Sequence, residues 1–288
     1  MYLCGSMKMK PFFTFWGVVL IALAFASCKS EFEKIRTSGD AALMLKTAND
    51  YYASEEYQKA QSLYELVISA YRGKKEAEDI YFNYAYTYYH LRQYVLAAYY
   101  FKNFAQTYGG SSRRQDAEFM AAYSNYQMSP SFRLDQTYTL KAIDEFQLFI
   151  NSYPNNPRVE ECNKLIDEMR AKLETKAFEE GKLYFDLREY QSAIQSFENL
   201  LKDFPETEQV DEVRYRIIRS AYLMAENSFV EKQKERYEDT VKRASDYVLR
   251  YPNSEYAKEI NSILENSKKK LNQLDNVRYQ EQSARAGS

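Results

Sequence analysis

The clearest fold signal in this chain is the segment FEEGKLYFDLREYQSAIQSFENLLKDFPET, residues 178–207. Its apolar residues return at intervals of three and four, which predicts a pair of helices. Small residues stand where the two helices would cross, and aromatic residues stand where the gaps between them would be filled. A proline follows the second helix, which it cannot continue. The pattern is defined by Gly181, Tyr184, Tyr190, Ala193, Phe197, Phe204 and Pro205.

The same pattern occurs twice more, at residues 42–73 and 78–110. This order of small and aromatic positions resembles the tetratricopeptide repeat. A single helix pair of this kind cannot bury its apolar face alone, so successive pairs must stack. In the first pair the pattern consists of Ala48, Tyr51, Tyr57, Ala60, Tyr64 and Tyr71, and in the second it recurs with identical spacing as Ala85, Tyr88, Tyr94, Ala97, Phe101 and Tyr108.

Two further pairs are less regular. Residues 116–126 and 138–157 form one of them, separated by an insertion, and residues 213–227 and 237–254 form the other. Pro154, Pro205 and Pro252 mark helix ends. Residues 159–181 have helical spacing without a turn signal, which predicts one long joining helix, with a break near Glu174 as the alternative. We therefore predict an all-α superhelical solenoid of about five tetratricopeptide-like pairs.

The sequence predicts five segments along the chain. Residues 1–27 form a signal peptide and residues 28–40 a lipidated tether. Residues 41–155 hold repeats one to three, and residues 156–275 hold the linking helix, repeats four and five and a capping helix. Residues 276–288 turn polar, which predicts a flexible tail.

The signal peptide is predicted from the stretch FWGVVLIALAFASCKS, residues 15–30. Lys8 and Lys10 precede an apolar region of about fifteen residues, which is shorter than the roughly twenty needed to span a bilayer. The motif FASC at residues 25–28 resembles a bacterial lipobox, with Phe25 in place of the more usual leucine. That resemblance implies acylation of Cys28 and stable anchoring through two or three chains. The alternative is an ordinary signal peptide with an incidental cysteine.

No catalytic, cofactor or metal site is predicted. The sequence contains no phosphate-binding glycine loop and no nucleophile motif. His90, the single histidine, falls in a solvent-facing turn, and Cys162 in a helical pattern reads as a buried structural thiol. A formal net charge of −2 provides no basic field for nucleic acid.

The sequence supports a binding surface more strongly than it supports a catalytic, cofactor or metal site. In tetratricopeptide arrays the second, fifth, ninth and twelfth positions of the first helix line a groove, and here several of these positions are aromatic. Such a groove would suit an extended peptide with aromatic side chains. The alternative is that the rings only pack between repeats. The candidate groove residues are Asn49, Tyr52, Phe82, Tyr86, Tyr89, Phe119, Tyr123 and Tyr126.

The order of lipobox and repeats resembles the BamD family, the lipoproteins of the outer-membrane β-barrel assembly machine. The likeness includes RLDQTYTLKAIDEFQLFINSYPNNPRVEECNKLI (residues 133–166) and AENSFVEKQKERYEDTV (residues 225–241). It implies a non-enzymatic, lipid-anchored scaffold at the periplasmic face of the outer membrane. The implied partners are a BamA-type barrel protein and unfolded outer-membrane proteins. The alternatives are a nutrient-binding surface lipoprotein partnered with a TonB-dependent transporter and a periplasmic cell-envelope adaptor.

Overall fold

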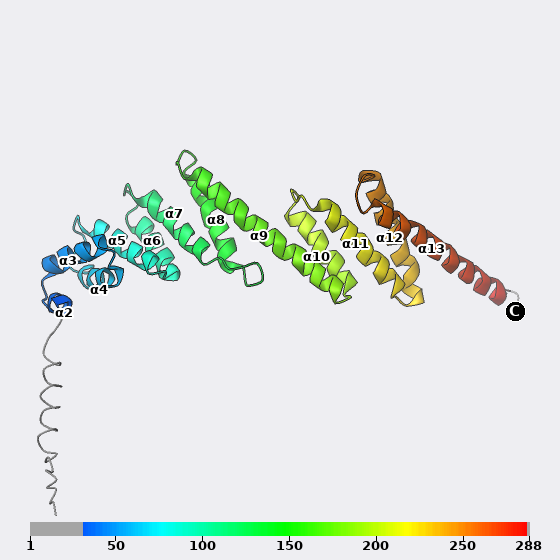
Figure 1. Ribbon diagram of the computed structural model, residues 1–288, viewed down its shortest axis with the longest axis horizontal. Helices are drawn as coiled ribbons and strands as arrows, with labels where there is room; N and C mark the ends of the chain where they lie inside the picture. Colours follow the sequence, from blue (N-terminus) through cyan, green and yellow to red (C-terminus); the bar gives the residue numbers. More distant parts are fainter. Residues whose placement is uncertain (1–30, 287–288) are drawn as a thin grey trace, which may run out of the picture. The chain divides into compact units, whose positions relative to one another are not determined.

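The computed structural model describes residues 31–286, with the side chains of residues 31–276 (Figure 1). Throughout this range the regular structure is helical and no strand occurs, which confirms the all-α prediction. The predicted signal peptide and Cys28 lie outside the described residues. The helices are α2 (Glu31–Arg36), α3 (Ala41–Ala53), α4 (Tyr57–Val67), α5 (Ala77–His90), α6 (Tyr94–Thr107), α7 (Arg114–Gln127), α8 (Thr137–Ser152), α9 (Val159–Asp186), α10 (Tyr190–Asp203), α11 (Val210–Glu226), α12 (Val230–Arg250) and α13 (Ala257–Ala286).

The helices belong to two compact units, which divide between Met128 and Ser129. The first unit holds α2 to α7 and the second holds α8 to α13. This boundary falls inside the third predicted pair, whereas the sequence placed its division after residue 155. In the second unit α8 packs against α9, so the second helix of that pair groups with the long helix that follows it.

In the first unit each helix packs on its neighbours in the sequence, from α3 against α4 through to α6 against α7. The small residues of the repeat pattern lie at the crossings. Ala48, Ala60, Ala85 and Ala97 are fully buried, and the rings of Tyr64 and Phe101 are fully buried beside them. Burial of these aromatic rings contributes apolar contact area between the helices.

The turn inside a helix pair has the same geometry in three pairs. After α3, α5 and α9 the chain enters the left-handed region at Glu55, Arg92 and Arg188, with φ of 62°, 58° and 63°. In the last of these, Arg188 N–H donates to the Phe185 carbonyl at 3.0 Å and Glu189 N–H to the Tyr184 carbonyl at 2.9 Å. This is a Schellman motif, formed here without glycine.

The connection between successive pairs is also repeated. The preceding helices end at an aromatic residue, and a polar residue three positions later accepts a backbone N–H two residues further on. That polar side chain satisfies one of the free donors at the start of the next helix. The polar residues are Ser111, Asn156, Thr207 and Ser254, which follow Tyr108, Tyr153, Phe204 and Tyr251.

The long joining helix is confirmed as α9, which runs without a break from Val159 to Asp186. Its first half packs against α8 and its second half against α10 (Figure 1). Cys162 is fully buried, and burial raises the pKa of its thiol to about 11. This confirms the predicted structural thiol.

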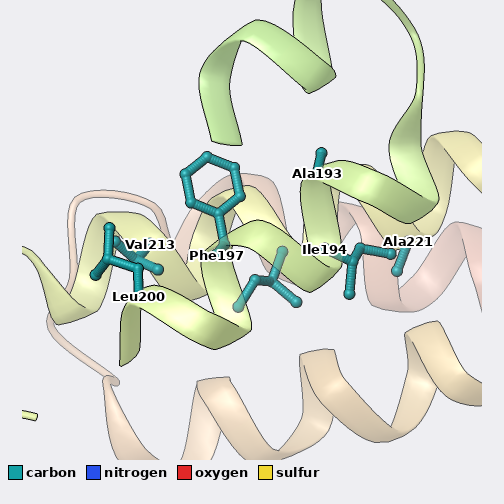
Figure 2. Packing of buried hydrophobic residues seen from close by; sticks show 7 residues of the cluster. Ala193, Ile194, Phe197, Leu200, Val213 and Ala221 are labelled. Carbon is teal, nitrogen blue, oxygen red and sulfur yellow. The ribbon is translucent and has the colours of Figure 1, made fainter. Parts of the chain in front are cut away.

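The core around α10 shows how the deciding segment packs. Ala193, Ile194, Phe197 and Leu200 of α10 form one cluster with residues of α11, including Val213 (Figure 2). A second cluster joins α11, α12 and α13 through Tyr215, Tyr247 and Ile260, among others. Both clusters are built from contacts between neighbouring helices, as expected for stacked repeats.

Helix α13 is longer than predicted. It begins at Ala257 and continues to Ala286, through residues for which the sequence predicted a flexible tail from residue 276. The stretch NVRYQEQSARA, residues 276–286, lacks glycine and proline and is rich in good helix formers, which accounts for the continuation.

Candidate peptide-binding surface

A continuous series of ring contacts crosses the first unit from α3 to α7. We call it the aromatic band, and define it as Tyr52, Tyr57, Phe82, Tyr86, Tyr89, His90, Phe119, Tyr123 and Tyr126. Seven of these nine residues are candidates from the sequence. The band exists because the first helix of each repeat presents the same face at each step of the stack.

The contacts within the band link different helices. His90 at the end of α5 stacks on Tyr57 of α4, with ring centroids 4.1 Å apart and planes 8° from parallel. The ring of Tyr52 in α3 lies 6.4 Å from the same imidazole. At the other end, Tyr89 of α5 and Tyr123 of α7 are 6.2 Å apart. Four helices therefore contribute to one aromatic surface.

The band is half-buried. Tyr52, Phe82, Tyr86, Tyr89, Tyr123 and Tyr126 retain part of their surface, whereas Phe119 is 3% exposed and stacks on Tyr123 at 5.6 Å. Phe119 is thus a packing residue that offers almost no area to a ligand. The other rings combine an accessible apolar face with a polar tip, a combination that suits recognition of extended chains.

Asn49, the remaining candidate, lies at an exposed position of α3 but serves the core. Its Oδ1 accepts a hydrogen bond of 2.8 Å from the hydroxyl of Tyr64, whose side chain is fully buried. This bond gives the buried phenol a partner, as a hydroxyl removed from water requires. Burial raises the pKa of Tyr64 to about 12.

Burial raises the pKa of Tyr89 and lowers the pKa of His90, which disfavours the charged forms of these two rings of the band. Desolvation, followed by the neighbouring Tyr123 and Tyr94, raises the pKa of Tyr89 to about 12. Burial lowers the pKa of His90 below the ordinary value of a histidine, against a smaller opposite effect of Glu55. A surface of neutral rings favours apolar and aromatic ligand groups over ions.

One cation borders the band. The Arg113 guanidinium lies 5.1 Å from the centroid of the Phe82 ring and forms a 2.8 Å ion pair with Asp79. The charge is therefore partnered both by a carboxylate and by an aromatic face. This arrangement leaves the apolar character of the neighbouring rings intact.

Sequence reasoning missed Tyr57 and His90 as members of the band. Tyr57 was assigned to packing between repeats, and His90 to a solvent-facing turn. His90 is indeed exposed, but the turn after α5 also brings it onto Tyr57. The contact joins residues of different repeats, so no spacing within one repeat would have indicated it.

Among the described residues, no group of three or more histidine, cysteine, aspartate or glutamate side chains could hold a metal ion. In the same part of the chain, no helix combines the length and apolar character needed to cross a bilayer.

The fold and the aromatic band define a helical-repeat protein with a candidate peptide-binding surface. A family model described as "Outer membrane lipoprotein", named YfiO, matches residues 38–236. The chain belongs to this YfiO family, the BamD-type outer membrane lipoproteins. No protein of curated function matches the chain.

Several solved structures of tetratricopeptide proteins are similar to the chain in fold. One is a repeat protein from Bacteroides fragilis, with 15% identity, a TM-score of 0.35, and coverage of 80% of this chain and 98% of that one. Another is the complex of the TPR2AB domain of yeast Sti1 with pHSP90, with 14% identity, a TM-score of 0.35, and coverage of 79% of this chain and 98% of that one. A third is a repeat protein from Thermus thermophilus, with 14% identity, a TM-score of 0.29, and coverage of 78% and 99%.

Proposed function

We propose that this protein is a non-enzymatic, lipid-anchored scaffold of the outer-membrane β-barrel assembly machine. In this function it binds a BamA-type barrel protein and receives segments of unfolded outer-membrane proteins. The family match over residues 38–236 is the observation that carries the proposal. Helical-repeat scaffolds of this kind act by binding, and the extended surface of stacked repeats suits long, unfolded ligands.

The aromatic band is the proposed receiving surface. Tyr52, Tyr86, Tyr89 and Tyr123 offer half-exposed rings at successive repeats, so an extended chain with alternating aromatic side chains would meet one ring after another. Tyrosine supplies a large contact area at low conformational cost, together with a hydroxyl for peptide groups. The ligand would be an extended, aromatic-containing segment of an unfolded protein.

Binding is tested with a fluorescent blocked peptide of alternating phenylalanine and serine residues and a matched peptide in which serine replaces phenylalanine. We expect Tyr89→Ala and Tyr123→Ala each to weaken binding of the aromatic peptide about tenfold, the usual effect of losing a central aromatic contact. Tyr99→Ala is the matched control, because Tyr99 is 57% exposed on α6 and lies outside the band. If Tyr89→Ala and Tyr123→Ala bound the aromatic peptide as tightly as the Tyr99→Ala control, the rings of the band would serve only in packing between helices.

The anchor is proposed to be Cys28, acylated after removal of residues 1–27. Metabolic labelling with an alkyne-bearing fatty acid should mark the wild-type protein and leave Cys28→Ala unlabelled. Labelling of the Cys28→Ala variant would contradict the assignment. Retention of residues 1–27 in the mature wild-type protein, measured by mass spectrometry, would do so too.

Partner identity is tested by purifying the tagged protein from cell envelopes in mild detergent. Recovery of a barrel protein with repeated periplasmic domains would support the scaffold function. Recovery of a TonB-dependent transporter would support the nutrient-binding alternative, and recovery of cell-wall enzymes the adaptor alternative.

A further inference from the structure

The inserted loop at residues 129–136, which leads into α8 of the second unit, is held mainly by polar side chains. From Ser129 to Asp135 no residue is buried, and Leu134 is 59% exposed. Apolar burial therefore contributes little to the position of this loop. Its hydrogen bonds to α8 and α9 must supply most of what fixes it.

The first set of hydrogen bonds closes the loop on itself through Gln136, which is 6% exposed. The Nε2 atom of Gln136 donates to the carbonyl oxygens of Ser131 at 2.9 Å and of Leu134 at 3.0 Å. Its Oε1 atom accepts a 2.7 Å hydrogen bond from the hydroxyl of Thr139 in α8. The buried amide thus joins the middle of the loop to the first turn of α8.

The second set attaches the loop to α9 through two lysines, one helical turn apart. The Nζ atom of Lys176 donates to the carbonyl oxygens of Phe132 and Leu134, both at 3.1 Å. The Nζ atom of Lys172 donates to Ser129 Oγ at 2.7 Å. A charged donor makes each of these hydrogen bonds stronger than a bond between neutral groups.

The two sets are joined into one chain of hydrogen bonds. The hydroxyl groups of Ser129 and Thr139 are 2.6 Å apart. Because Thr139 gives its proton to Gln136, Ser129 is the donor in this contact, and it accepts in turn from Lys172. Hydrogen bonds linked in this way polarise and position one another, so the loss of one weakens the rest.

We propose that residues 129–136 form a polar strap, which opens and closes as one unit on α8 and α9. Segments with few buried apolar contacts open locally at a lower free energy than the core of the protein. Opening frees the seven residues before Gln136, which span up to about 25 Å when extended. The strap is therefore a reserve of chain between α7 and α8, released without unfolding either helix. This inference does not depend on the proposed function.

Trypsin cleavage after Arg133 of the full-length protein, followed by mass spectrometry, measures opening, because Arg133 is an exposed residue in the middle of the strap. We expect Lys176→Met to speed this cleavage at least tenfold, as the loss of hydrogen bonds to a charged group implies. Lys172→Met should speed it similarly, although the hydrogen bond of Lys172 is to Ser129, at the far end of the strap. Wild-type cleavage in Lys172→Met would overturn the proposal that the strap opens as one unit.

Two controls separate opening of the strap from unfolding of the second unit. Lys164→Met removes an exposed lysine of α9 that lies outside the strap contacts, and it should leave cleavage after Arg133 unchanged. Cleavage after Arg214 in α11 should stay at the wild-type rate in all three variants. If cleavage after Arg214 rose as much as cleavage after Arg133, the lysines would stabilise the whole unit and the proposal would be wrong.

Discussion

At Gly181 the helices α9 and α10 approach each other so closely that a methyl group would not fit. A Cβ built on Gly181 would lie 2.5 Å from Cε1 of Phe197, whose ring is fully buried. Ala48 and Ala85 occupy the same position of the repeat in the first unit. The glycine therefore reflects a closer crossing in this pair.

We expect Gly181→Ala to lower the free energy of unfolding by up to about 2 kcal/mol. The overlap with Phe197 costs roughly 1–3 kcal/mol, which outweighs the gain in helix propensity of about 1 kcal/mol. Urea unfolding measures the difference. Gly110→Ala is the control, because nothing lies within 4 Å of the added Cβ there. Equal stability of the Gly181→Ala variant and the wild type would mean that the crossing relaxes freely.

Among the elements, the turn within a helix pair carries backbone strain. Arg188 occupies the left-handed region at φ 63°, where a side chain is unfavourable and glycine is not. The hydrogen bonds of the Schellman motif and the packing of the two helices hold it there. The sequence carries no glycine at this position in any of the three pairs, so the strain is a shared property of these turns.

Arg188→Gly should raise the free energy of unfolding by about 0.5–1 kcal/mol, because glycine adopts this conformation without strain. Thermal unfolding gives the measurement. Arg188→Ala is the control, since it removes the same charge and stem but keeps the strain. If both variants changed stability alike, the effect would come from the side chain and not from φ.

The connections between pairs depend on a single polar side chain. Thr207 is 6% exposed; its Oγ1 accepts from Gln209 N–H at 3.1 Å and donates to Glu174 of α9 at 2.5 Å. It therefore begins α11 and also ties the connection to the long helix.

Thr207→Val should cost about 1–2 kcal/mol of stability, because the shape is kept while two hydrogen bonds are lost. Denaturant unfolding of the variant tests this value. Thr107→Val, at an exposed position at the end of α6, makes the same exchange and should be close to neutral. A similar loss in both variants would mean that the two hydrogen bonds of Thr207 do not account for the effect.

At the scale of the whole molecule, tyrosine side chains fill several of the buried positions between helices that leucine often fills in other proteins. The chain has 28 tyrosines. Several buried ones use their hydroxyls as links, such as Tyr215 of α11, which donates to Glu259 of α13 at 2.9 Å. A phenol fills the space between helices and also satisfies a polar group, so burial and hydrogen bonding coincide.

This usage predicts unfolding in alkali. Burial raises the pKa of Tyr64, Tyr88 and Tyr89 from 10.0 to about 12. Between pH 10 and 12 the unfolded chain has lost these protons while the folded chain retains them. The unfolded state then binds fewer protons, so the free energy of unfolding falls as pH rises across this interval.

Tm measured against pH, together with tyrosinate absorbance, checks this prediction. We expect little change in Tm between pH 7 and 9, and a steep fall above pH 10 that coincides with late ionisation of a group of tyrosines. Complete ionisation near pH 10 in the still-folded protein would contradict the burial effect.

The helix pairs follow from the sequence because their signals are local. The small and aromatic positions from Gly181 to Phe197, and prolines such as Pro154, lie within one or two helices of each other. The unbroken α9 and the buried Cys162 could be predicted for the same reason. The tail from residue 276 was predicted from polarity, whereas its composition of helix formers agrees with the helix that the structure contains.

The all-α repeat architecture follows from the amino-acid sequence, because every repeat carries the spacing that its own two helices need. The contacts between side chains of different repeats became known only from the three-dimensional fold. This fold joined His90 to Tyr57, buried Phe119 and engaged Asn49 with Tyr64. These contacts depend on how closely successive helices approach and how they are rotated, and neither quantity is encoded in the spacing within a single repeat.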